Sequence, residues 1–227
     1  MPTLLVIGSS SGIGASIAQQ LLSQGNEVIG ISRTNRNNLP LHFSFDVTSN
    51  ETFPVVEKPI DGLVYCPGSI VLKPFRALKE QDFLQDFQLN FVSAMKAIQA
   101  YLPNLQQSEN ASIVLFSTVA VQTGMPFHAS VAASKGAIEG LTRSLAAEFA
   151  PKIRVNCIAP SLTDTPLAAR LLDSETKIAS AKERHPLKKI ANADEIAKMA
   201  MFLLSESAGF MTGQIIKMDG GISSVKS

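Results

Sequence analysis

Short runs of apolar residues alternate along this chain with longer amphipathic segments. Runs such as Leu4–Ile7 and Ile113–Phe116 contain no polar side chain, which is typical of strands that are buried on both faces of a sheet. The pattern predicts strands over residues 3–7, 27–31, 41–45, 61–65, 112–117, 153–158 and 214–218. It predicts helices over residues 12–24, 80–102, 130–150, 166–183 and 193–205.

The alternation of strand and helix is typical of βαβ units. It predicts an α/β fold with a doubly wound, parallel, seven-stranded sheet that is covered by helices on both faces. The first predicted helix carries Ile13 and Ile17 in helical register. Residues 46–61 leave room for only a vestigial helix, because Pro54 and Pro59 interrupt it.

The composition is that of a globular chain without separate modules. Its 227 residues are 45% hydrophobic and carry a formal net charge of +1. We therefore expect one domain over residues 1–227, with neither a nucleic acid nor a membrane as partner. The start of the chain lacks the features of a signal peptide and two cysteines form no disulfide framework, so a cytoplasmic location is expected. Cys157, within a predicted strand, is expected to be a small buried side chain.

A glycine-rich turn follows the first predicted strand and opens the first helix. The turn reads Gly8-Ser9-Ser10-Ser11-Gly12-Ile13-Gly14. In a dinucleotide-binding turn, the first glycine permits a tight bend, the second lets the backbone approach the pyrophosphate, and the third lets the helix pack on the strand. Backbone N–H groups at the start of the helix then face the phosphates. The turn therefore predicts a single-domain Rossmann fold that binds a dinucleotide.

The same turn admits two other interpretations. Gly8, Ser10 and Gly12 also spell Gly-x-Ser-x-Gly, the turn that carries the nucleophile of many serine hydrolases, with His128 or His185 as a base. That turn normally follows several strands, whereas only one strand precedes it here. The remaining alternative is a glycine turn that binds no ligand.

The end of the second predicted strand bears on the choice of dinucleotide. A carboxylate there would accept hydrogen bonds from a ribose 2′-hydroxyl and repel a 2′-phosphate, but the strand ends with Ser32 and Arg33. Arg33, with Arg36 nearby, could pair with the phosphate. The sequence therefore favours NADP(H) over NAD(H), with a solvated arginine as the alternative.

Motifs along the whole chain resemble those of the short-chain dehydrogenase/reductase family, especially its ketoacyl-acyl-carrier-protein reductases. Besides the glycine spacing, the resemblance rests on Asp46-Val47, Asn90, and the segments Arg154–Pro160 and Thr212–Gly221. It implies an oxidoreductase that acts on a carbonyl or an alcohol with a nicotinamide cofactor. The cofactor-binding residues that we expect are Gly8, Ser10, Ser11, Gly12, Ile13, Gly14, Arg33, Asp46, Val47, Gly68, Asn90, Lys135, Pro160, Thr163 and Thr165.

The chain departs from the family pattern where the chemistry takes place. The family's active-site helix carries Tyr-x-x-x-Lys, and here Lys135 is retained while Val131 stands at the position of the tyrosine. The family's catalytic serine corresponds to Thr118, and only Gly68 remains of its Asn-Asn-Ala-Gly segment. The resemblance thus implies Asn90, Thr118 and Lys135 as catalytic residues, and it leaves no phenol to donate a proton.

The missing tyrosine leaves two functions open. One is an NADP(H)-dependent oxidoreductase with an altered acid–base site, in which His128, Ser130, Tyr65 or a water held by Asn90 and Lys135 replaces the phenol. In simpler roles, His128 would be a loop residue in solvent, Ser130 a helix N-cap and Tyr65 a ring near the nucleotide. The other function is a catalytically inactive NADP(H)-binding pseudoenzyme, a sensor or a partner subunit. A serine hydrolase that uses Ser10 is the remote alternative.

The resemblance also bears on substrate and assembly. Residues 162–190 would form a lid over a small-molecule substrate, and leucines in the lid indicate either a partly hydrophobic substrate or simple packing. No metal ion is expected. Family members pair through the helices that match 80–102 and 130–150 and then through the closing strand, so a homotetramer or a homodimer is expected. The small residues that would allow close approach there are Ala94, Ala97, Ala133 and Ala137.

Overall fold

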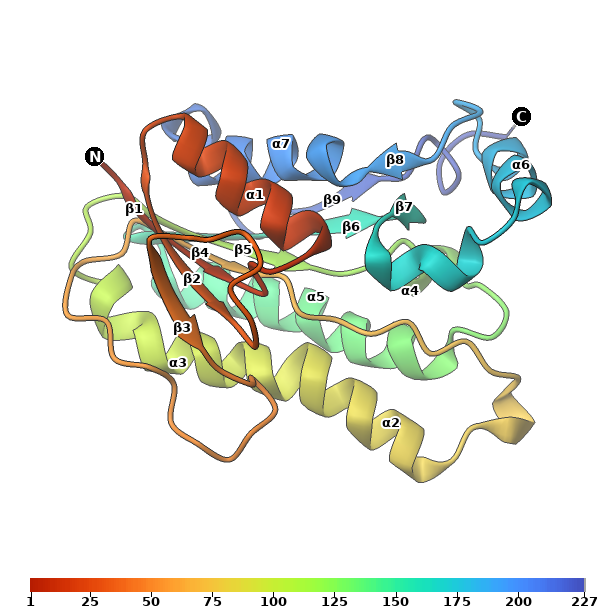
Figure 1. The fold of residues 1–227 in the computed structure, drawn as a ribbon, viewed down its shortest axis with the longest axis horizontal. Helices are drawn as coiled ribbons and strands as arrows, with labels where there is room; N and C mark the ends of the chain where they lie inside the picture. Colours follow the sequence, from red (N-terminus) through yellow and green to blue (C-terminus); the bar gives the residue numbers. More distant parts are fainter. Residues whose placement is uncertain (227) are drawn as a thin grey trace.

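A computed structural model describes residues 1–226 as one α/β unit built on a parallel sheet (Figure 1). The strands of the sheet are β1 (Thr3–Ile7), β2 (Glu27–Ser32), β3 (Leu41–Ser44), β4 (Gly62–Tyr65), β5 (Ala111–Phe116), β6 (Ile153–Pro160) and β9 (Ile215–Met218). They lie in the order β3-β2-β1-β4-β5-β6-β9, and every neighbouring pair is parallel. This is the doubly wound Rossmann fold that the sequence predicts.

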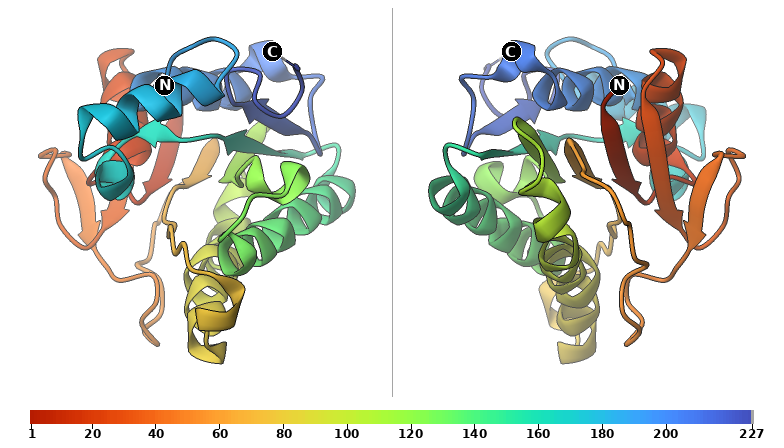
Figure 2. Two further views of the ribbon diagram at one scale, coloured as in Figure 1. Left: turned by 90° about the vertical axis from the view of Figure 1, so that its right-hand side faces the viewer. Right: turned by 90° about the vertical axis from the view of Figure 1, so that its left-hand side faces the viewer.

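Helices cover both faces of the sheet (Figure 2). They are α1 (Gly12–Ser23), α2 (Glu80–Phe87), α3 (Ser93–Leu105), α4 (Ala120–Thr123), α5 (Ala129–Phe149), α6 (Glu175–Arg184) and α7 (Ala193–Leu204). The apolar side chains of α1 and α7 pack on one face, in a core that includes Ile17 and Ile196. Those of α3 and α5 pack on the other face, in a core that includes Tyr101 and Ile138. The buried strands confirm the interpretation of the apolar runs, and Cys157 is fully buried as predicted.

The structure divides two helices that the sequence predicts as continuous. Between α2 and α3 lies η2 (Gln88–Val92), a π-helical turn that holds the fully buried Asn90. The predicted helix 166–183 is instead the 3₁₀ turn η3 (Pro166–Leu171) followed by α6. The second helix starts afresh because the Ser174 hydroxyl accepts a hydrogen bond from the Lys177 N–H at 3.3 Å.

Short elements complete the described part of the chain. They are the 3₁₀ turns η1 (Phe75–Ala77) and η4 (Glu206–Ala208), and the parallel pair β7 (Thr163–Asp164) and β8 (Ala191–Asn192). Within residues 46–61 no helix forms, so even a vestigial one is absent there. None of the helices in residues 1–226 is long and apolar enough to span a bilayer.

The topology brings four chain segments to one edge of the sheet. Because β1, β4, β5 and β6 are parallel neighbours, their carboxyl ends lie together. The segments that follow these strands are the glycine turn, Cys66–Gly68, Ser117–Thr118 and Ser161–Leu171. In open α/β sheets, ligands bind at this edge, beside the point where the strand order reverses.

Candidate active site

The glycine turn has the backbone geometry that the sequence predicts. Gly8 and Gly12 have φ angles of +84° and +55°, a region that favours glycine. A Cβ atom on Gly14 would overlap the carbonyl oxygen of Gly8, so the helix approaches the strand closely only because this residue is glycine. Ser11 is the N-cap of α1, and its side chain makes no capping hydrogen bond. The first N–H groups of α1 therefore remain available to an anion.

A groove of about 460 Å³ runs along this turn. The expected cofactor-binding residues that line it are Gly8, Ser10, Ser11, Gly12, Ile13, Gly14, Arg33, Asp46, Val47, Gly68 and Thr165. Within residues 1–226, no histidine lines this groove beside Ser10. These features suit a dinucleotide, with a glycine cradle and free N–H groups beside the place of its pyrophosphate.

Two charged side chains lie at the far end of the groove. Asp46 accepts hydrogen bonds from the backbone N–H and the hydroxyl of Thr48, at 2.9 and 2.7 Å. These bonds, with the charge of Arg33, hold the pKa of Asp46 below its usual value. Arg33 is exposed and forms no ion pair within residues 1–226, so its guanidinium is available to a ligand. Arg36 does not line the groove.

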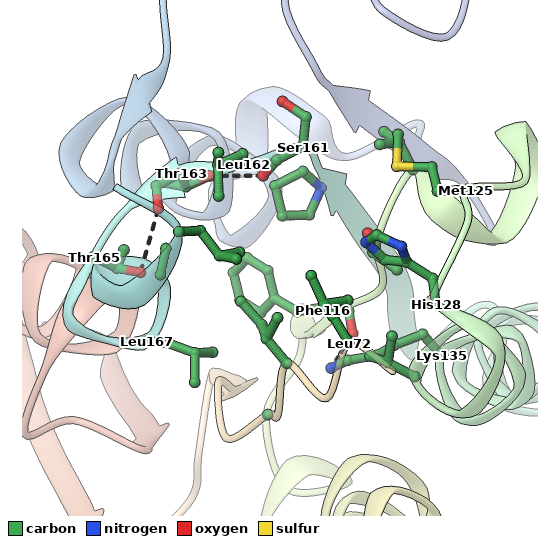
Figure 3. Close-up of a pocket in the computed structure, with 18 of the residues that line it drawn as sticks. Leu72, Phe116, Met125, His128, Lys135, Ser161, Leu162, Thr163, Thr165 and Leu167 are labelled. Carbon is green, nitrogen blue, oxygen red and sulfur yellow. Dashed lines mark hydrogen bonds between the residues drawn. The ribbon is translucent and has the colours of Figure 1, made fainter. Parts of the chain in front are cut away.

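A second cavity, of about 630 Å³, adjoins the groove (Figure 3). Its walls are mostly apolar. The residues that line both the cavity and the groove are Ile13, Cys66, Gly68, Thr165 and Leu167. Among the expected cofactor-binding residues, Pro160, Thr163 and Lys135 line the cavity only. The two spaces therefore form one continuous cleft, with a nucleotide end and an apolar end.

Lys135 lies at the base of the cavity, on α5. Its Nζ donates a hydrogen bond to the Phe116 carbonyl oxygen at 2.9 Å, and the side chain is 7% exposed. A Cβ atom on Gly68 would lie 3.4 Å from this Nζ, so the backbone of residue 68 packs over the ammonium group. Burial lowers the pKa of Lys135 from 10.5 to about 8. The structure thus contains a buried amine that is poised to titrate close to neutral pH.

Thr118, His128 and Val131 line the same cavity as Lys135. The Val131 isopropyl group is buried and lies one helical turn before Lys135. The Thr118 Oγ1 accepts a weak hydrogen bond from the Ala120 N–H at 3.3 Å, which leaves the hydroxyl proton free. Figure 3 shows Leu167, His128 and Lys135 around the same space.

The imidazole of His128 is half-buried in the cavity wall, and it is therefore not the solvent-facing loop side chain of the simpler interpretation. Its Nδ1 lies 2.8 Å from the carbonyl oxygen of Pro126. A carbonyl oxygen only accepts, so Nδ1 carries a proton. Nε2 is then the ring nitrogen that can take up or release a second proton.

Asn90 lies behind the cavity and lines neither space. Its Nδ2 donates hydrogen bonds to the hydroxyls of Ser69 and Ser134, both at 3.0 Å. Ser69 lines the cavity, and its hydroxyl donates to the buried carboxylate of Asp86 at 2.5 Å. The other oxygen of Asp86, Oδ2, has no hydrogen-bond partner among residues 1–226. Sequence reasoning missed Ser69 and Asp86, and no spacing rule joins residues 17 positions apart in this way.

Two other candidate proton donors lie outside the cavity. The Tyr65 hydroxyl donates to the Leu89 carbonyl oxygen at 2.8 Å, and burial strongly raises the pKa of this phenol. Tyr65 lines neither the groove nor the cavity, so it is not a ring beside the nucleotide site. Ser130 is not an N-cap either, because α5 begins at Ala129 with His128 in that position. The Ser130 hydroxyl is buried and has no hydrogen-bond partner in the part of the chain that the structure describes.

The residues after β6 form a further polar contact that the sequence does not reveal. Ser161 Oγ lies 2.9 Å from Nε2 of His185, whose Nδ1 lies 2.7 Å from the Ala181 carbonyl oxygen. The ring therefore donates through Nδ1 and accepts from Ser161 through Nε2. This pair joins the end of β6 to α6 at the cavity wall. It holds the end of α6 beside the end of β6.

Comparisons with known proteins agree with this geometry. A family model described as Enoyl-(Acyl carrier protein) reductase matches residues 7–223. The 3-oxoacyl-[acyl-carrier-protein] reductase FabG of Thermotoga maritima is 30% identical, over 96% of this chain and 96% of its own length.

Solved structures resemble the chain over its whole length. The ligand-free aldohexose dehydrogenase of Thermoplasma acidophilum has a TM-score of 0.89 and 26% identity, over 100% of this chain and 96% of its own. A tyrosine-to-phenylalanine variant of ElxO with NADPH bound has a TM-score of 0.87 and 25% identity, over 99% of each chain. The chain belongs to the short-chain dehydrogenase/reductase family of oxidoreductases.

Proposed function

We propose that the chain is an NADP(H)-dependent oxidoreductase that interconverts a carbonyl compound and an alcohol at an altered acid–base site. The observation that carries this proposal is the position of Lys135. Its buried amine lies at the base of an apolar cavity that is continuous with a dinucleotide groove. A buried cation with a shifted pKa in a cleft is typical of a functional site, because burial of the charge costs free energy.

Three side chains have separate roles in the proposed reaction: one binds the cofactor, one orients the substrate and one transfers a proton. The nicotinamide cofactor, when bound, supplies or accepts the hydride. Lys135 would hold the hydroxyls of the nicotinamide ribose when the cofactor is bound. Thr118 donates a hydrogen bond from its free hydroxyl to the carbonyl oxygen of the substrate and keeps its proton. His128 transfers to that oxygen the one proton that reduction requires, and it accepts this proton back in oxidation.

The assignment of His128 rests on the exclusion of the other donors. Tyr65 and Ser130 do not line the cavity, and Asn90 is committed to Ser69 and Ser134. Burial raises the pKa of the Cys66 thiol to about 12, so this thiol is a poor acid at neutral pH. Of the three candidate side chains His128, Ser130 and Tyr65, His128 is thus the one that lines the cavity.

Substitution of His128 by alanine is expected to lower kcat for ketone reduction about tenfold. The loss is smaller than for a fully buried acid, because water can enter this half-buried position. Steady-state kinetics with NADPH measures kcat. Phe127→Ala, at the exposed neighbour outside the cavity, is the control, and an equal loss in both variants would contradict the role of His128.

Val131 supports a second candidate function. An isopropyl group at this position cannot donate a proton, so the same cleft suits a catalytically inactive protein that binds NADP(H). Such a protein would act as a sensor or as the inactive partner in a mixed oligomer. The two functions predict the same cofactor binding and differ in turnover.

The cofactor preference depends on Arg33. We expect NADPH to bind more tightly than NADH, by about tenfold or more, because the unpaired guanidinium can bind the 2′-phosphate. Arg33→Asp should reverse the order, since the new carboxylate repels the phosphate and accepts hydrogen bonds from the ribose. Isothermal calorimetry measures both affinities. Arg36→Asp, outside the groove, is the control. Equal affinities in the unmodified protein would contradict this preference.

A homodimer or homotetramer remains our expectation for the assembly, formed through the outer faces of α2, α3 and α5 and through β9. Of the small residues expected at the interface, Ala94 and Ala97 are fully buried in the core, so the structure removes them from this surface. Ala133 is exposed, and α2 adds the exposed side chains of Leu84 and Phe87. A monomer mass in light scattering at micromolar concentration would contradict this expectation.

A further inference from the structure

The wall that α6 contributes to the cavity is polar, whereas most of the cavity is apolar. Lys177, Ser180 and Arg184 line the cavity together with Thr176. Residues 177, 180 and 184 recur at intervals of three and four, so they share one face of the helix. The lid therefore presents a single polar face to the substrate end of the cleft, and the side chains of this face are also exposed to solvent.

All formal charges around the cavity have the same sign. The charged lining residues are Lys135, Lys177 and Arg184, and in the described part of the chain no aspartate or glutamate lines the cavity. Lys177 and Arg184 do not line the groove, so they lie at the end of the cleft remote from the place of the dinucleotide phosphates. Positive charge inside walls of low polarity raises the local concentration of anions. The cavity thus favours an anionic ligand.

Of the two lid cations that line the cavity, Lys177 has an acidic partner and Arg184 has none within residues 1–226. Lys177 Nζ lies 2.8 Å from Asp173 Oδ1, and the carboxylate of Glu183 is paired with Lys188 at 3.2 Å. Arg184 forms no ion pair in the part of the chain that the structure describes. The dipole of α6 would account for a cation in the last turn of the helix. It does not account for the position of Arg184 in the cavity wall.

We propose that the substrate is an apolar carbonyl compound with an anionic group at the end remote from its carbonyl, and that Arg184 binds this group. The inference rests on the proposed function in taking the cavity as the substrate site. A planar guanidinium can bind a carboxylate or a phosphate through two parallel hydrogen bonds. The hydroxyl of Ser180, one turn earlier on the same face, supplies a further donor. The apolar part of the substrate lies against Leu72, Leu167 and Leu171.

Calorimetry with unreactive probes tests the inference without turnover. Octanoate and octyl phosphate carry an apolar chain and an anion, whereas octanol carries the chain alone. We expect the unmodified protein to bind at least one anionic probe about fivefold more tightly than octanol, the upper end for a partly exposed ion pair. This preference should shrink as ionic strength rises. The tighter of the two anionic probes identifies the anion as carboxylate or phosphate.

Arg184→Gln should abolish the preference for the anionic probe and leave octanol binding unchanged. Lys182→Gln removes an exposed cation of the same helix that lies outside the cavity, and it should behave like the unmodified protein. Three results would overturn the inference: no binding of any probe, no preference for an anion, or equal loss in both variants. A protein that binds octanoate through Arg184 but reduces no keto acid would instead contradict the proposed oxidoreductase alone.

Discussion

Replacement of Val131 by tyrosine is expected to raise the rate of ketone reduction by NADPH at least ~10²-fold, the low end of acid–base contributions. The new phenol would lie one helical turn before Lys135, in the wall of the cavity. The ammonium charge of Lys135 favours the phenolate and lowers the pKa of the phenol. With Thr118 at the carbonyl oxygen, the site would again contain an acid, an orienting hydroxyl and a ribose anchor.

Val131→Phe is the matched control for this experiment. It introduces the same ring without the hydroxyl, so it separates proton donation from a change in cavity shape. Stopped-flow absorbance of NADPH with activated ketones measures the rate, and calorimetry confirms that cofactor binding is intact. An equal rate in the tyrosine and phenylalanine variants would show that the position of residue 131 is not where a proton is delivered.

Lys135→Met is expected to weaken NADPH binding while it stabilises the fold. The lost ammonium removes charge-assisted hydrogen bonds to the ribose, which corresponds to a decrease in affinity of about tenfold to a hundredfold. Burial of the charged amine costs about 3 kcal/mol at neutral pH, since it lowers the pKa from 10.5 to about 8. The lost hydrogen bond to the Phe116 carbonyl reduces the net gain in unfolding free energy to about 2 kcal/mol.

The pH dependence of the unfolding free energy distinguishes the cost of burying the Lys135 charge from a general effect of the substitution. Between about pH 8 and pH 10.5 the unfolded chain binds the Lys135 proton more tightly than the folded chain. The unfolding free energy of the unmodified protein should therefore rise with pH across this window, and the penalty is present in full below pH 8. In Lys135→Met this rise should be absent.

Urea unfolding at a series of pH values measures these free energies. Lys96→Met, at an exposed position of α3, is the control for the loss of one lysine charge. The interpretation fails if Lys135→Met lowers stability at pH 7, or if the rise between pH 8 and pH 10.5 persists in that variant.

Much of the fold follows from local sequence signals. Uninterrupted apolar runs identify the central strands because a parallel sheet buries both of its faces. The glycine turn can also be recognised in the sequence, because Gly14 lies so close to the Gly8 carbonyl oxygen that no other residue fits at this position. Signals of this kind lie within a few residues of one another. They are therefore visible in the sequence before any tertiary contact is known.

The polar contacts around the cavity could not be read in the same way. Ser69 meets Asp86 and Ser161 meets His185 only because the chain folds back between them. The π-helical turn at Asn90 is similar, because one extra residue in a turn leaves the hydrophobic pattern of 80–102 almost unchanged. Arg184 lines the cavity because α6 starts at Glu175, after a break that the periodicity did not indicate.

Deuteride transfer by the unmodified protein tests the central claim most directly. NADPH that carries deuterium at the transferred position would be mixed with excess protein and a set of activated ketones and medium-chain keto acids, and the alcohol product analysed by mass spectrometry. If the chain is an oxidoreductase, at least one alcohol acquires the deuterium, and the transfer slows in His128→Ala. If NADPH binds and Val131→Tyr transfers deuterium while the unmodified protein transfers none, the oxidoreductase is contradicted and the protein is an inactive NADP(H)-binding member of its family.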